Sequence, residues 1–173
     1  MTPARRAAAA LRARPDLAER VLLLAEPALV AKVASPEDVV ALVLPHLAGR
    51  ETEALVAIAL DRRRRVVDVA VLTTGTAAFT IVDSAQVYRW ALTRTRAVCA
   101  VILAHNHPSN DPTPSVQDVD VTRRVAAAGR VVGVQLLDHV VVCDNGTFES
   151  IADRGELPAY TDAVGVLADR SAR

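Results

Sequence analysis

Two almost unbroken apolar runs near the middle of the chain give the first indication of its fold. Residues 54–60 and 66–72 are mainly apolar, and the polar segment 61–65 separates them. Apolar runs of this length between polar breaks are typical of buried strands. They predict two strands joined by a short turn.

Apolar runs and helix-like patterns alternate along the rest of the chain. Further strands are predicted at residues 77–82, 97–105, 131–137, 139–143 and 147–151, and helices at residues 16–33, 35–49, 83–95 and 115–128. Ser35 is a favourable N-cap for the second helix, with Pro36 and Asp38 in its first turn. Gly129 is expected to end the last helix at its C′ position. The whole pattern predicts an α/β (α+β layered) fold, with a mixed β-sheet flanked by helices.

The composition agrees with one packed domain and argues against several other classes of protein. The 173 residues are 51% hydrophobic, which is enough for a core. Lys and Arg total 20, as do Asp and Glu, and this zero net charge argues against a general binder of nucleic acid or anionic membranes. Two distant cysteines, Cys99 and Cys143, provide neither a disulfide framework nor a CxxC zinc motif.

The N-terminal region predicts neither a leader nor a membrane segment. Its apolar stretch is interrupted by Glu26 and Pro27, whereas a secretory signal needs an unbroken apolar run. No apolar run approaches the length of a membrane span. The Arg- and Ala-rich residues 1–15 weakly resemble a transit peptide, but a surface helix is the favoured interpretation. We therefore expect a cytoplasmic protein.

Two of the four histidines lie at the end of the most apolar predicted strand. His105 and His107 are two residues apart, so their imidazoles point to the same side of an extended chain. Neutral imidazoles are good zinc ligands, and a catalytic zinc needs a third protein ligand, such as an acid or another histidine. Asp118, in the first turn of the following helix, is the candidate for that ligand.

These residues also have purely structural interpretations. His-x-His on a strand can be a partly buried, hydrogen-bonded pair, and Ser115-x-x-Asp118 can be a helix capping box, which is compatible with ligation. A hydrolytic zinc site also needs a base that is not a ligand, and Glu51 and Glu53 precede the first apolar run. Glu53 is the better candidate because it adjoins the strand, although an isolated glutamate there is more often a solvated charge.

The spacing of these residues resembles that of a known family. Glu53, His105-x-His107 and, after seven intervening residues, Ser115-x-x-Asp118 resemble the signature of the JAMM (MPN+) metalloproteases. The string AHNHPSNDPTPS, followed by LLDHVVV, resembles the RadC branch of that superfamily. The resemblance covers about residues 50–157.

The resemblance implies a fold and a division of the chain. The fold would be JAMM/MPN-like, with an architecture similar to that of cytidine deaminases. A RadC-like domain would occupy residues 49–158, after a helical N-terminal extension of residues 1–48 and before a C-terminal tail of residues 159–173. Asn110 stands where RadC proteins usually carry glycine, and asparagine tolerates the left-handed backbone that such a turn needs.

The resemblance also implies a chemistry. Zinc would be held by His105, His107 and Asp118. Glu53 would be the general acid/base that activates a zinc-bound water, and Ser115 would donate a hydrogen bond to the scissile carbonyl or its oxyanion. The implied activity is hydrolysis of amide or isopeptide bonds in a protein or peptide substrate.

Two other functions are alternatives, a DNA-repair-associated RadC-like binding module and a metal-dependent nuclease. The run Arg62–Arg65 could grip phosphate, but zero net charge favours a solvated turn between strands. RadC proteins usually carry an N-terminal helix-hairpin-helix region associated with DNA binding, and it is not recognisable in this sequence.

Two further residues near the histidines have competing interpretations. His139 could hydrogen-bond a ligand side chain, but a structural role at a strand edge is favoured. Asn106 lies between His105 and His107, so its side chain is expected to point to the opposite face and to be structural.

Overall fold

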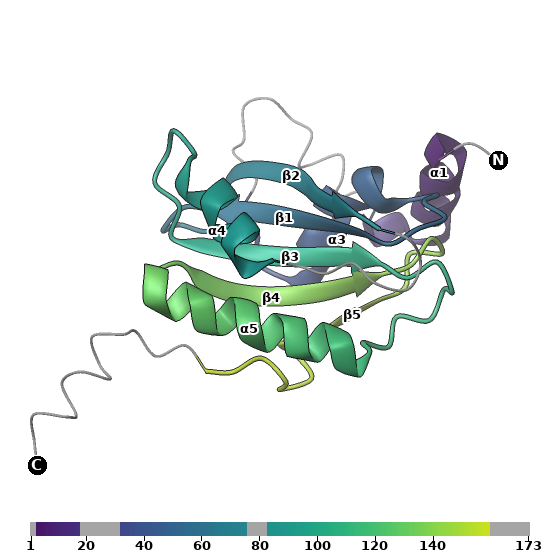
Figure 1. Cartoon of the computed structure of the whole chain (residues 1–173). Coiled ribbons are helices and arrows are strands. Elements are labelled where there is room, and N and C mark those ends of the chain that lie inside the picture. The colour runs from purple at the N-terminus through teal and green to yellow at the C-terminus, as the bar shows by residue number, and fades with distance from the viewer. Residues whose placement is uncertain (1–2, 18–31, 76–82, 160–173) are drawn as a thin grey trace, which may run out of the picture.

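The part of the chain that the structure describes folds around a five-stranded sheet with helices on both faces (Figure 1). The structure is a computed structural model that describes residues 3–17, 32–75 and 83–159. The predicted strand at residues 77–82 lies outside these ranges, as does most of the predicted helix at residues 16–33. None of the helices within the described ranges is long and apolar enough to cross a bilayer.

The sheet is mixed, as the sequence predicted. Its strands are β1 (Ala54–Leu60), β2 (Val66–Thr74), β3 (Ala100–Asn106), β4 (Gln135–Val142) and β5 (Phe148–Ser150). Their order is β2-β1-β3-β4-β5, and β3 and β4 are parallel whereas the other neighbours are antiparallel. Every residue of β1 and of β3 is buried, which explains why these two segments are the most continuously apolar of the chain.

Each face of the sheet carries its own hydrophobic cluster. One cluster joins alternate residues of β1, such as Val56 and Ile58, to helices α1 (Pro3–Ala13) and α3 (Pro36–Leu47). The other joins Leu55 and Ala57 to helices α4 (Ser84–Leu92) and α5 (Val116–Val132). Successive side chains of a strand point to opposite faces, so a wholly apolar strand can feed both clusters.

The start of α3 agrees with the prediction from its sequence. Ser35 is the N-cap, Pro36 lies in the first turn, and Asp38 completes a capping box. The Asp38 carboxylate accepts hydrogen bonds from the backbone N–H groups of Ala34 and Ser35, at 2.9 and 3.1 Å. These bonds satisfy donors that the helix itself leaves unpaired.

The predicted end of α5 is wrong. Gly129 lies inside the helix, which continues to Val132 and ends at Gly133, whose φ of 72° is left-handed. Gly129 is needed for close packing instead, because a Cβ there would overlap the Tyr88 hydroxyl and the Val134 carbonyl.

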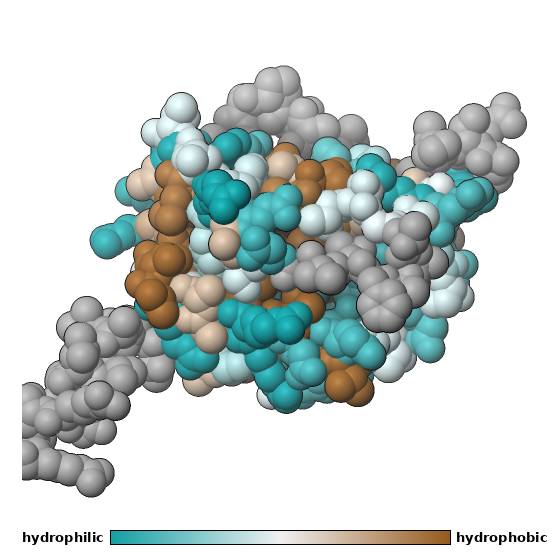
Figure 2. Space-filling view, viewed as in Figure 1, coloured by the Kyte–Doolittle hydropathy of each residue, from teal (hydrophilic) through white to brown (hydrophobic). Residues whose placement is uncertain are grey.

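The predicted strands at residues 131–137 and 139–143 are therefore corrected to one strand, β4. Val131 and Val132 look like the start of a strand by composition, but they are exposed on the last turn of α5, at 79% and 41%. Figure 2 shows hydrophobic surface, in brown, along the edge where α4 and α5 end.

Candidate metal centre

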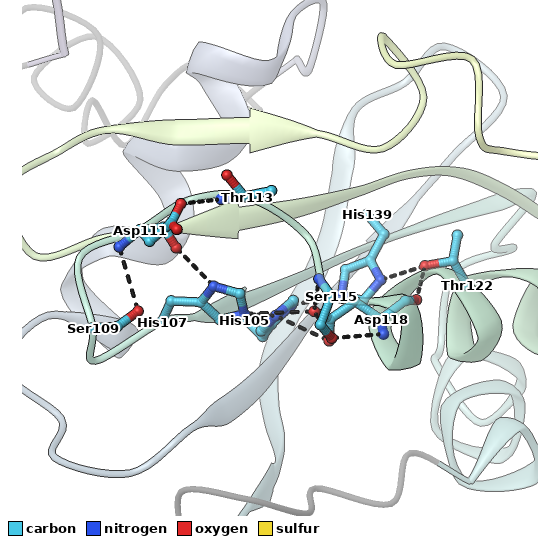
Figure 3. A network of polar contacts seen from close by, with 9 residues as sticks. All are labelled: His105, His107, Ser109, Asp111, Thr113, Ser115, Asp118, Thr122 and His139. Carbon is cyan, nitrogen blue, oxygen red and sulfur yellow. Dashed lines mark hydrogen bonds and ion pairs between the residues drawn. The ribbon is translucent and has the colours of Figure 1, made fainter.

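Two histidines and one carboxylate meet where β3 ends and α5 begins (Figure 3). His105 is the penultimate residue of β3, His107 follows the strand, and Asp118 lies in the first turn of α5. The Nε2 atoms of the two histidines are 3.0 Å apart. Asp118 Oδ1 is 3.3 Å from Nε2 of His105, and Oδ2 is 3.5 Å from Nε2 of His107. The structure thus brings the three predicted ligands together.

The loop between β3 and α5 returns the chain to the strand end. The His107 N–H donates to the carbonyl of Val142 at 3.1 Å, which extends the pairing with β4. The Asn110 N–H donates to the carbonyl of His107, closing a turn in which Asn110 has a φ of 61°. The expected left-handed backbone at Asn110 is therefore confirmed, and this turn helps to bring Asp118 back beside the histidines.

Asp118 is at the same time a helix cap and a candidate ligand. Its Oδ2 accepts from the Ser115 backbone N–H at 2.7 Å and from the Ser115 hydroxyl at 2.6 Å. The Ser115 oxygen in turn accepts from the Asp118 N–H, so the predicted capping box is confirmed. Burial raises the pKa of Asp118, but the adjacent His105 and His107 rings and the Ser115 hydroxyl outweigh burial and hold that pKa well below its ordinary range.

His107 is held from its outer side by the loop. Its Nδ1 lies 2.8 Å from the carbonyl oxygen of Asp111. A carbonyl can only accept, so Nδ1 carries the proton and Nε2 presents its lone pair towards Asp118 and His105 in the neutral ring. In the protonated ring, Nε2–H would donate to Asp118, and this hydrogen bond raises the pKa of His107 against the opposing effect of burial. The carboxylates around this ring therefore attract a cation to Nε2, whether a proton or a metal ion.

His105 is held by a second histidine, which is deeply buried. His105 Nδ1 lies 2.9 Å from Nε2 of His139, and His139 Nδ1 lies 2.6 Å from the Thr122 hydroxyl. Burial, together with the nearby His105, lowers the pKa of His139 to about 3. The favoured interpretation of His139 as a strand-edge residue is wrong, because β4 lies between β3 and β5 and the ring contacts a candidate ligand.

Glu53 lies beside this cluster at the start of β1. Leu55 pairs with His105, and continuing the antiparallel register by two residues places Glu53 opposite His107. The Glu53 carboxylate contributes to the raised pKa of His107, although less than Asp118 does. Within the described ranges it has no hydrogen-bond or ion-pair partner, whereas Glu51 is exposed.

Asn106 holds the backbone on both sides of Glu53. Its Oδ1 accepts from the Ala54 N–H at 2.8 Å, and its Nδ2 donates to the Thr52 carbonyl at 3.2 Å. The Gly75 N–H donates to the carbonyl of Glu53 itself at 3.0 Å. The side chain of Asn106 is thus directed away from the histidines, as expected, but it contacts the segment that carries the candidate base.

The donor set fits a divalent metal such as zinc. Four ligands arranged tetrahedrally at about 2.0–2.1 Å lie about 3.3 Å from one another. The two Nε2 atoms, 3.0 Å apart, are near that spacing, and each has a carboxylate oxygen of Asp118 at 3.3 or 3.5 Å. One ligand atom from each of the three residues lies within 4.8 Å of the others. Two imidazole lone pairs beside a carboxylate would repel one another without a cation between them, and this arrangement is typical of metal sites.

Most of the sequence matches the model of a known family. The family of the RadC-like JAB domain matches residues 33–156. This chain belongs to the RadC-like JAB family. The expected RadC branch of the JAB/MPN fold is therefore confirmed, and the fold of the RadC-like domain is the mixed α/β fold described above.

This RadC-like chain is similar in sequence to several UPF0758 proteins. A UPF0758 protein of Symbiobacterium thermophilum is 41% identical over 123 residues, which are 71% of this chain and 51% of that protein. A UPF0758 protein of Methanosarcina acetivorans is 35% identical over 124 residues, 72% of this chain and 53% of that protein. One of Desulfitobacterium hafniense is 33% identical over 150 residues, 87% of this chain and 64% of that protein. The chain spans about half the length of most of these curated relatives.

One member of the RadC-like site was missed by sequence reasoning. Thr122 is fully buried on α5 and donates to the backbone carbonyl of Asp118 at 2.6 Å, while its oxygen contacts His139. The available signal was its spacing, because residues four apart on a helix share a face, so Thr122 follows Asp118 towards the sheet.

Proposed function

We propose that this protein is a zinc-dependent hydrolase that cleaves amide or isopeptide bonds in a peptide or protein substrate. The observation that carries the proposal is the convergence of His105, His107 and Asp118 beside Glu53, a free carboxylate within the described ranges. A metal hydrolase needs three protein ligands and a base that is not itself a ligand. The same four residues meet both needs.

The ligands and the base would divide the work between them. His105, His107 and Asp118 would hold the zinc ion, which when bound supplies a Lewis acid that makes water more acidic and polarises a carbonyl group. The Glu53 carboxylate would accept a proton from the attacking water and would donate it to the leaving amine nitrogen. Its backbone, held by Asn106 and Gly75, keeps the carboxylate near that proton path.

Ser115 would stabilise the oxyanion, but its hydroxyl already donates a hydrogen bond within the helix cap. The single hydroxyl proton of Ser115 donates to Asp118 Oδ2 in this structure. A hydrogen bond to the oxyanion would require the hydroxyl to rotate away from Asp118. Asp118 Oδ2 would then still accept from the Ser115 backbone N–H, so the helix cap would survive the rotation. The proposed donation to the oxyanion is therefore compatible with the capping box.

A protein or peptide substrate and a cytoplasmic location belong to the same proposal. The nuclease and the DNA-binding module remain alternatives with less support. Arg62, Arg63 and Arg64 are exposed in the turn between β1 and β2, at the end of β1 opposite to Glu53. Asp61 engages Arg65 at 2.8 Å in the same turn. The arginine turn therefore lies at the far end of β1 from the metal site.

The experiment combines metal content with hydrolysis. The purified chain would be analysed for zinc by mass spectrometry and assayed on peptides and on lysine-isopeptide model substrates. We expect Glu53→Gln to retain zinc and to lower kcat/KM by about 10²- to 10⁴-fold, because general acid–base catalysis contributes that much. We expect His105→Ala to lose zinc and activity together.

Two results would contradict the proposal. One is a wild-type protein that contains no zinc and whose hydrolytic activity is unchanged by His105→Ala. The other is equal hydrolysis by wild type and Glu53→Gln, which would remove the assigned base. Nicking of plasmid DNA that disappears in Asp118→Ala would instead favour the nuclease.

A further inference from the structure

Behind the candidate ligands, a chain of hydrogen bonds runs from the backbone of α5 to the ring of His105 (Figure 3). Its first member is the carbonyl oxygen of Asp118, which can only accept. Thr122 Oγ1 lies 2.6 Å from that oxygen, so the single hydroxyl proton of Thr122 points to Asp118. The direction of every later bond in the chain follows from this one.

The Thr122 oxygen must therefore accept from its other neighbour. That neighbour is Nδ1 of His139, at 2.6 Å, so Nδ1 carries a proton. His139 is only 2% exposed, and such burial disfavours a charged ring, so the neutral ring has one N–H and its Nε2 is an acceptor. Nδ1 of His105, 2.9 Å away, is then the donor. A neutral His105 with its proton on Nδ1 presents a lone pair at Nε2, towards His107 and Asp118.

We propose that Thr122 and His139 are positioning residues that fix the tautomer of His105, so that its Nε2 lone pair faces the metal site. The inference rests on the proposed metal site, but not on the reaction assigned to it. The protein reaches the same result for His107 by a shorter route, because its Nδ1 donates directly to the carbonyl of Asp111. Both candidate ligands are thus oriented by a backbone carbonyl, in one case directly and in the other through two side chains.

Without the Thr122 hydroxyl, nothing would fix which atom donates and which accepts in the hydrogen bonds of His139 and His105. In Thr122→Val, a side chain of the same shape leaves Nδ1 of His139 without its acceptor. His139 could then place its proton on Nε2 and donate to His105, whose own proton would move to Nε2 and face the metal site. A metal ion would have to displace that proton, so metal affinity would fall. Thr122→Ser keeps the hydroxyl and is the matched control.

The tautomers can be read directly in the metal-free protein. Long-range ¹H–¹⁵N spectra at pH 8 distinguish the two nitrogens of each neutral imidazole. We expect the Nδ1–H form of both His105 and His139 in wild type and in Thr122→Ser, and the Nε2–H form of His105 in Thr122→Val. Zinc affinity, measured by competition with a chromophoric chelator, should fall about 10- to 100-fold in Thr122→Val, and much less in Thr122→Ser. Thermal unfolding of each variant would show that it is folded.

Two outcomes would overturn the inference. An Nε2–H tautomer of His105 in wild type would show that the chain does not run in the assigned direction. An unchanged His105 tautomer in Thr122→Val, with unchanged zinc affinity, would show that Thr122 and His139 do not set it. The predicted tautomers and affinities in a protein that hydrolyses no amide bond would leave this inference standing while the proposed function failed.

Discussion

The two sides of the candidate site are held in different ways. On the ligand side, where β3 ends and α5 begins, His105, His107 and Asp118 each have a hydrogen bond to a group outside the set of ligands. On the base side, at the start of β1, the backbone around Glu53 is held, but its carboxylate has no partner within the described ranges. Fixed lone pairs suit metal ligands, whereas a carboxylate that carries a proton from one atom to another needs freedom to move.

One residue connects the two sides. Asn106 lies in β3 between His105 and His107, yet its amide contacts the backbone of Thr52 and Ala54 in the neighbouring segment. Alternation along a strand makes this arrangement possible, because the side chain between two ligands points to the other face. A substitution at Asn106 should therefore disturb the base and spare the ligands, which makes the comparison testable.

The largest effect is expected on the ligand side, from Asp118→Asn. Asparagine keeps an oxygen that can accept from the Ser115 N–H, so the helix cap should remain, but the negative charge between the histidines is lost. Zinc affinity should fall by about a thousandfold, beyond the 10- to 100-fold that loss of an outer hydrogen-bond partner costs. Chelator competition would measure it, and Asp120→Asn, an exposed acid on the same helix, is the matched control. Equal zinc affinity of Asp118→Asn and wild type would remove Asp118 from the ligands.

The next effect is expected on the base side, from Asn106→Leu. The Ala54 N–H and the Thr52 carbonyl would lose their partners, and the unfolding free energy should fall by about 1–3 kcal/mol. Misplacement of Glu53 by about 1 Å should lower kcat by about 10²-fold, while zinc affinity should change little.

Asn106→Asp separates positioning from folding on this side. It retains an oxygen that can accept from the Ala54 N–H, so its kcat should lie between those of wild type and Asn106→Leu. If zinc affinity falls as far as kcat does in Asn106→Leu, Asn106 supports the ligands as well as Glu53, and the two sides of the site are not held independently.

The sequence predicted those parts of the fold and site that depend on local pattern. The start of α3 followed from Ser35 and Asp38, and the capping box of α5 followed from Ser115 and Asp118, because a cap is a contact between residues three apart. The meeting of His105, His107 and Asp118 followed from strand alternation and a short return loop. In each case the residues that make the contact are close in sequence.

The parts that the sequence did not predict depend on contacts between distant segments. A glycine in an Ala-rich segment can end a helix or admit a close neighbour, and at Gly129 only the approach of Tyr88 and Val134 decides between them. The link from Thr122 through His139 to His105 depends on the parallel pairing of β3 with β4, which places His139 beside Leu103. No local pattern fixes that register.

The smallest effect is expected in the loop of the ligand side, from Asn110→Ala. Alanine in the left-handed backbone of Asn110 costs about 1 kcal/mol, because its Cβ crowds the following carbonyl. The loop also supplies the Asp111 carbonyl that accepts from His107, so zinc affinity should fall by up to about fivefold, the equivalent of that free energy. Asn110→Gly, which tolerates a positive φ, should lose less than half as much stability. Chemical unfolding and zinc competition on the same samples would compare the two variants. A larger loss in Asn110→Gly than in Asn110→Ala would show that the asparagine side chain, rather than the backbone conformation, supports this side of the site.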